Sequence, residues 1–168
     1  MNSVVSIRKC DDYVLPNLAE AIERAIGDLG GISEFVRPGD KVLLKPNLLL
    51  SADPSKAIVT HPIFVEIVAS KFIDAGARVY IGDSPPLGNL ARVLAKSGYN
   101  AFMTRMGIEL VPFKEKISLE FSDGSLFRRI DIAKEVLEFD AVINLPKVKT
   151  HTQMVLTLAV KNLFGTVI

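Results

Sequence analysis

Short apolar runs and stretches of helical periodicity alternate along the chain. Apolar side chains recur at helical spacing from Leu15 to Leu29, and again behind Pro62, and each stretch ends near a glycine. The short runs show no polar alternation, which indicates strands buried on both faces. We predict strands at 4–7, 41–45, within 78–86 and at 140–145. We predict helices at 15–29, after Pro62, within 90–106 (one helix, or two broken near Gly98) and at 132–139.

Residues 109–130 follow a different pattern. Ile117, Leu119 and Phe121 alternate with polar residues, and an Asp123-Gly124 turn signal follows. We predict a small inserted β-hairpin at about residues 109–130. The alternation of strand and helix elsewhere predicts an α/β fold with a mainly parallel sheet and helices on both faces.

Composition limits the class of protein. A chain of 168 residues with 49% hydrophobic content fits a single α/β domain, residues 1–168. The net charge of +1 argues against nucleic-acid and membrane-surface partners. Cys10 is the single cysteine, so no iron–sulfur cluster can be ligated by cysteines within this chain. No signal peptide or membrane-length apolar run is visible, which predicts a cytoplasmic protein and leaves the oligomeric state open.

Three predicted strands end with the same arrangement of residues. The exits read LLKPN (Lys45 to Asn47), IGDSP (Asp83 to Pro85) and INLPK (Asn144 to Lys147). Each places polar groups at the end of an apolar strand and then a proline, which cannot donate to a strand ladder. In a parallel sheet these exits share one edge, where ligands bind. The THP sequence at 60–62 opens a helix on that edge.

The polar residues of this edge are mostly basic. No acid lies between Ala141 and the C-terminus, and Asp83 is the obvious carboxylate among the strand exits. The candidate ligand-binding residues are Lys45, Asn47, Lys147, Lys149, Lys161 and Asn162. The candidate catalytic residues, which are also the candidate metal ligands, are His61, Asp83 and His151. This set suits an anionic small molecule, a carboxylate or a phosphate, with histidine and aspartate left for proton transfer or metal ligation.

Structural explanations compete with each assignment. The lysines fit a solvated loop or a strand end, and His61 fits a helix start. Asp83 fits a helix cap or the anchor of a loop that contains glycine and proline. Lys161 and Asn162 fit the polar face of a final helix whose Leu158 and Leu163 face inward. Neither a glycine-rich phosphate loop nor a G-x-S-x-G nucleophile elbow is present, which lowers the case for nucleotide binding and serine hydrolysis.

Five motifs together resemble the domain-of-unknown-function 362 family of bacteria and archaea. They are VLLKPNLL (42–49), THP (60–62), IGDSP (81–85), DAVINLPKVKTH (140–151) and TLAVKNLFG (157–165). The resemblance implies a shared site around these strand exits. It also implies a ferredoxin-like partner and electron transfer, because many members carry a cysteine-rich segment that this chain lacks. Members usually continue past KNLFG, so the chain is expected to be the N-terminal part of a longer architecture; an edge strand at 166–168 is the alternative.

The sequence therefore supports two functional hypotheses, beside a third possibility, an incomplete gene product with no activity of its own. The first is an enzyme domain, or a fragment of one, that binds a small anion and carries out redox or proton-transfer chemistry, with or without a metal. The second is a non-catalytic module that docks an iron–sulfur electron-transfer partner or another subunit on its basic edge. Substrate, cofactor and completeness of the site are not determined by the sequence.

Overall fold

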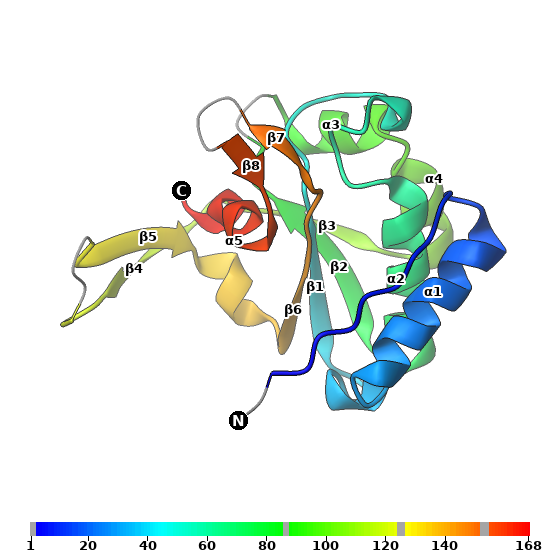
Figure 1. Ribbon diagram of the computed structural model, residues 1–168. Helices are drawn as coiled ribbons and strands as arrows, with labels where there is room; N and C mark the ends of the chain where they lie inside the picture. Colours follow the sequence, from blue (N-terminus) through cyan, green and yellow to red (C-terminus); the bar gives the residue numbers. More distant parts are fainter. Residues whose placement is uncertain (1–2, 86–87, 124–126, 152–154) are drawn as a thin grey trace.

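A four-stranded parallel sheet forms the centre of the protein (Figure 1). The computed structural model describes residues 3–85, 88–123, 127–151 and 155–168. The strands lie in the order β3-β2-β1-β6, and each neighbouring pair is parallel. Their bounds are β1 Lys41–Pro46, β2 Arg78–Asp83, β3 Glu109–Pro112 and β6 Ala141–Leu145. The predicted α/β class with a parallel sheet is confirmed.

Four α-helices lie to one side of this sheet (Figure 1): α1 Leu15–Asp28, α2 Pro62–Asp74, α3 Leu90–Lys96 and α4 Asn100–Met106. The chain moves from β1 to β2 to β3 in one direction, so right-handed crossovers place α2, α3 and α4 on the same face. Gly98, at a φ of 81°, separates α3 from α4, as the two-helix alternative predicted. A glycine suits that left-handed conformation because it has no Cβ.

The return from β3 to β6 crosses the other face. It carries the antiparallel hairpin β4 (Lys116–Glu120) and β5 (Arg129–Ala133), then the 3₁₀ helix η3 (Lys134–Glu138). After β6 come β7 (Lys149–His151), β8 (Val155–Thr157), α5 (Ala159–Asn162) and the 3₁₀ helix η4 (Leu163–Thr166). The remaining 3₁₀ turns are η1 (Ile32–Glu34) and η2 (Pro54–Lys56). Short helices lie on this second face, α5 among them, while the hairpin projects away from the sheet (Figure 1).

The main core lies between the sheet and the first helical layer. Val42, Leu44 and Ile81 of the strands are fully buried there, and Phe72 of α2 and Phe102 of α4 pack in the same cluster. The strands read as continuous apolar runs because both of their faces are covered. This packing fixes β1 and β2, whose C-terminal ends carry Lys45 and Asp83.

Several predicted elements need correction. Residues 4–7 do not form a strand; no other segment pairs with them in the described chain, and an extended segment without a ladder is not a strand. Residues 109–112 belong to the main sheet, so the hairpin begins at Lys116. Its predicted turn includes Gly124, which lies outside the described residues. The short helix predicted at 132–139 is a 3₁₀ helix at 134–138, because Ile132 and Ala133 belong to β5.

The C-terminal segment also differs from expectation. The pair β7–β8 was not predicted, and α5 has only four residues. Leu158 and Leu163 are exposed, so they do not face inward from a final helix. Val167 makes an isolated antiparallel bridge to Ile132. A single bridge is not a strand, so the edge strand considered for residues 166–168 does not form in the described chain.

Candidate functional site

The candidate site lies where the strand order reverses. From β1 the chain builds outward to β2 and β3, then returns to add β6 on the other side of β1. Lys45 and Asn144 are direct partners in the β1–β6 register, at the C-terminal ends of both strands. Open α/β sheets bind ligands at such a switch point because the loops diverge there. The sheet therefore brings the LLKPN and INLPK exits together, as predicted.

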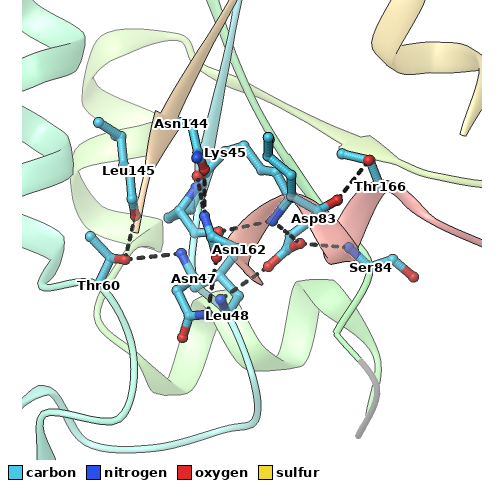
Figure 2. Close-up of polar contacts among 12 residues, drawn as sticks. Lys45, Asn47, Leu48, Thr60, Asp83, Ser84, Asn144, Leu145, Asn162 and Thr166 are labelled. Atoms are coloured by element: carbon cyan, nitrogen blue, oxygen red, sulfur yellow. Dashed lines mark hydrogen bonds and ion pairs between the residues drawn. The ribbon is translucent and has the colours of Figure 1, made fainter. Parts of the chain in front are cut away.

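Lys45 and Asp83 form a buried ion pair between the ends of β1 and β2 (Figure 2). The Lys45 Nζ atom lies 2.6 Å from Asp83 Oδ1, and the side chains are 1% and 6% exposed. The second oxygen, Asp83 Oδ2, accepts a hydrogen bond from the Leu48 backbone N–H at 3.0 Å. The Ser84 N–H donates to Oδ1 at 3.0 Å. The carboxylate thus holds the start of both exit loops.

Burial dominates the electrostatics of this pair. Loss of hydration lowers the pKa of Lys45 and raises the pKa of Asp83, and in each case the partner's charge opposes part of the shift. Gly165 packs directly on the pair: a Cβ at this position would lie 2.2 Å from Asp83 Oδ1 and 2.7 Å from Lys45 Nζ. The pair is therefore closed over by η4, and Lys45 points at Asp83 instead of at solvent.

Asn162 connects three of the segments that meet here (Figure 2). Its amide nitrogen donates to the Lys45 carbonyl at 3.1 Å and to Asn144 Oδ1 at 2.7 Å. Its amide oxygen accepts from Asn47 Nδ2 at 3.0 Å. Asn144 in turn donates to the carbonyl of Ala159 at 2.9 Å. These bonds fasten α5 onto the ends of β1 and β6, which places the KNLFG motif over the site.

Thr60 fixes the start of α2 against the same strand ends. Its hydroxyl donates to the Leu145 carbonyl at 2.7 Å and accepts from the Asn47 N–H at 2.9 Å. The buried Tyr99 hydroxyl donates to the Thr60 carbonyl at 2.7 Å, and burial raises the Tyr99 pKa above its usual range. The THP motif is thus held by the strand exits, and Tyr99 is a supporting residue that the sequence interpretation missed.

Lys149 is partly buried, and its ammonium group lies near other positive charges. Its ammonium donates to Asn47 Oδ1 at 2.7 Å and to the Ile58 carbonyl at 2.5 Å. Partial burial lowers its pKa, and the positive charges of Lys147 and Lys161 lower it further; Asp83 opposes these effects. Three lysines therefore share one electrostatic environment, as the sequence pattern suggested.

The ammonium groups of Lys147 and Lys161 lie over the aromatic rings of Tyr13 and Phe164. Lys147 Nζ donates to the Tyr13 hydroxyl at 3.2 Å. Lys161 Nζ lies 5.0 Å from the centroid of the Phe164 ring, a cation–π distance. Tyr13 was not predicted as a site residue, because a single tyrosine before the first helix carries no distinguishing pattern.

His61 caps α2 and stacks on Tyr13. The ring centroids are 3.8 Å apart, with 16° between the planes, and Nδ1 accepts from the Ile63 N–H at 3.3 Å. Burial and the charge of Lys147 lower the His61 pKa, so the ring is neutral near pH 7. The helix-start explanation therefore holds for His61, and the cap does not use its Nε2 atom.

His151 ends β7, opposite Val155 of β8. Among the residues that the structure describes, no three His, Cys, Asp or Glu side chains come together as a metal-binding group. His61, Asp83 and His151 are accordingly not assembled into a three-ligand cluster here. Their proposed roles in catalysis or metal ligation stay predictions.

In the part of the chain that the structure describes, no helix is both long and apolar enough to cross a lipid bilayer.

Comparison with known proteins gives a family and a relative. The family described as "Domain of unknown function (DUF362)" matches residues 42–168. The thylakoid-associated protein sll1697 of Synechocystis sp. is 37% identical over 163 residues, which cover 97% of this chain and 50% of that protein. The chain thus spans about half the length of this curated relative. No solved structure matches significantly.

The matched region contains every strand exit described above. All of the motifs that carried the resemblance, from VLLKPNLL to TLAVKNLFG, lie within residues 42–168. The chain therefore belongs to the DUF362 family.

Proposed function

We propose that this chain binds a small anion, a carboxylate or a phosphate, at the switch point between β1 and β6. One observation carries the proposal. The half-buried ammonium of Lys149 lies in the field of Lys147 and Lys161, while the Asp83 carboxylate that opposes them is already paired with Lys45 at 2.6 Å. An anionic ligand would offset the repulsion that remains. Charge-assisted hydrogen bonds from lysine to such groups are among the stronger polar contacts in proteins.

The residues divide into two groups in this proposal. Lys147, Lys149 and Lys161 contact the anion. Lys45 and Asp83, covered by Gly165, hold the exit loops in place, and Asn162 fastens α5 above them. Lys45 and Asp83 therefore position the loops in this proposal. Lys45 does not contact the ligand, although the sequence pattern placed it among the ligand-binding candidates.

Proton transfer is the chemistry that best suits these side chains. His61 is neutral near pH 7 because burial and Lys147 lower its pKa, so it can accept a proton from a bound ligand. His151 is the second proposed acid–base group, and Asp83 acts through the loops it anchors. Redox or metal-assisted chemistry, which the ferredoxin-like segments of family members imply, stays a prediction for this chain.

Docking of an acidic electron-transfer partner or subunit is the second candidate. The exposed side chains of Val148, Val160 and Phe164 lie in the same segment as the lysines, and an apolar patch beside basic residues suits protein recognition. The cyanobacterial relative is named for its association with thylakoids. The cytoplasmic location expected from the sequence therefore stays a prediction for this chain.

Calorimetric titration with defined anions tests the first candidate. Inorganic phosphate, pyrophosphate, citrate and malate would be titrated at low ionic strength into the wild type, Lys149→Met and Lys41→Met. Lys41 is the matched control because it begins β1, at the opposite end of the strand from the site. We expect at least one anion to bind, and Lys149→Met to weaken that binding about tenfold or more, as loss of one charge-assisted bond implies. Lys41→Met should bind like the wild type.

The two candidates give different results. Absence of binding by all four anions at millimolar concentration, or equal weakening in both variants, would contradict an anion site built on Lys149. Docking instead predicts no small-anion binding, together with partner binding that weakens steeply with salt and loses a similar amount for each lysine removed.

A further inference from the structure

The outer edge of β6 has no strand partner in the described chain. β6 pairs with β1 on one side, and it ends the sheet order β3-β2-β1-β6. Ala141, Val142 and Ile143 are only partly buried although they are apolar. Parallel strands of this composition are normally covered on both faces and along their edges. The edge is therefore open to pairing with another chain.

An apolar groove runs beside this edge. It forms a cavity of about 280 Å³ between β6, α1 and α2, whose lining includes Ile26, Leu29, Phe64 and Ile143. The N-terminal segment is attached at the end of α1, and residues of α1 line this groove. Ser6 Oγ and Arg8 bond to Asp28, at the end of α1, which holds this segment next to Leu29.

Two apolar residues of that segment are largely exposed. Val5 and Ile7 flank Ser6, and they are 77% and 88% exposed. Phe35, which also lines the groove, is exposed as well. Ile143 belongs both to the free edge strand and to the lining of the groove, so the apolar surface is continuous from β6 to the groove, and such a surface marks an interaction site.

The charges at the two ends of β6 have opposite sign. The exposed acids Glu138 and Asp140 precede the strand, and Lys147 follows it. A strand of this kind is complementary to a second copy of itself running antiparallel, because the basic end of each copy meets the acidic end of the other. A parallel arrangement would place like charges together.

We propose that a second copy of this chain pairs antiparallel with the free edge of β6, so that one sheet continues across a two-fold dimer. Each copy covers the apolar groove and the N-terminal valine and isoleucine side chains of the other. The same patch serves both subunits, as two-fold symmetry requires. The inference goes beyond the proposed anion site, and its test needs no ligand.

Sedimentation equilibrium and light scattering on the 168-residue protein, over about 1 to 200 µM, measure the association directly. We expect a dimer with a Kd within that range. Lys147→Glu and Glu138→Lys should each raise the Kd about tenfold, since each replaces two symmetry-related attractions by repulsions. The double variant should restore the wild-type Kd within about threefold, because it exchanges the charges. Glu138 is exposed and Lys147 is partly exposed, so folding is expected to survive, and circular dichroism checks it.

Amide hydrogen exchange locates the contact. Residues 141–145 should become more protected as the concentration passes the Kd, while residues 41–46 of the central strand β1 should not change. A monomer throughout the range would overturn the proposal and leave the edge to a different polypeptide. A dimer that the swapped double variant does not restore, or whose β6 amides stay unprotected, would overturn it too.

Discussion

Removing either member of the buried ion pair should destabilise the fold strongly, and removing both should cost much less than the sum of the two single losses. At 2.6 Å, the attraction between Lys45 and Asp83 amounts to about 6 kcal/mol at an effective dielectric constant of 20, before the cost of desolvating the two groups. Deleting one partner of such a pair typically destabilises a protein by about 3–5 kcal/mol, because a buried charge is left alone. We expect Lys45→Met and Asp83→Asn each to fall in that range.

The double variant isolates the interaction. When Lys45→Met and Asp83→Asn are combined, no buried ion remains to be accommodated, and the amide oxygen introduced at position 83 can still accept the bond from the Leu48 N–H. The loss should therefore be smaller than the sum of the single losses by more than about 2 kcal/mol. Urea denaturation at pH 7, followed by circular dichroism, gives the three free energies of unfolding. Additive losses would refute the claim that the two groups act as a pair.

The pH dependence of the destabilisation caused by Lys45→Met gives an independent check, because the pKa shift of Asp83 fixes its direction. Burial already raises the pKa of Asp83, and removal of the lysine charge would raise it further. A carboxyl whose folded pKa lies above its unfolded value near 3.9 is most favourable to folding below that value, and stability is lost as pH rises through the folded pKa. The cost of Lys45→Met should thus be smaller at pH 4 than at pH 8. A cost that is larger at pH 4 would contradict this reasoning.

Three further predictions concern the surroundings of the pair. Gly165→Ala should destabilise the fold by about 1–3 kcal/mol in urea denaturation, since its Cβ would overlap Asp83; Gly27→Ala, with open space around it inside α1, should not. His61→Asn keeps a capping side chain but removes a group whose folded pKa is lowered. Wild-type stability should fall as pH drops below about 6.5, and this variant should show a shallower fall between pH 7 and 5. Asn162→Ala should cost about 2 kcal/mol or more, because it leaves three buried or half-buried polar partners unsatisfied; a smaller loss would mean that α5 is held in another way.

The parallel sheet was predictable because its strands are apolar throughout. Val42 to Leu44 and the start of β6 have no polar alternation, and this pattern is typical of strands covered on both faces. Prolines at the exits then marked where each strand ends, so the meeting of Lys45, Asp83 and Asn144 at one edge followed from topology.

Pairing between distant segments could not be predicted in the same way. Whether residues 4–7 form a strand depends on a neighbour, and no local pattern supplies one. The same holds for β7–β8, which are three residues each. Leu158 and Leu163 fit a helical face on spacing alone, but α5 is too short to bury them.

The inner and outer lysines were not distinguishable by sequence. Lys45 lies at the end of one apolar strand and Lys149 follows another, yet Lys45 is covered by Gly165 and Lys149 is half-buried in the field of Lys147. That difference arises from α5 and η4 folding back over β1, a contact between residues more than a hundred positions apart. Tyr13 and Tyr99 were missed because their partners are also distant in the sequence: Tyr13 contacts His61 and Lys147, and Tyr99 donates to Thr60.

The measurement that tests the anion site most directly is NMR of the lysine side chains in protein carrying ¹⁵N-labelled lysine. Lys→Arg variants would assign the signals, and sodium phosphate would then be titrated at constant ionic strength. The proposed site predicts saturable shifts of the Lys149 Nζ signal and of its neighbours Lys147 and Lys161, with the Lys41 signal unchanged. Uniform, non-saturating shifts of all four lysines would contradict a phosphate-binding site at this edge of the sheet.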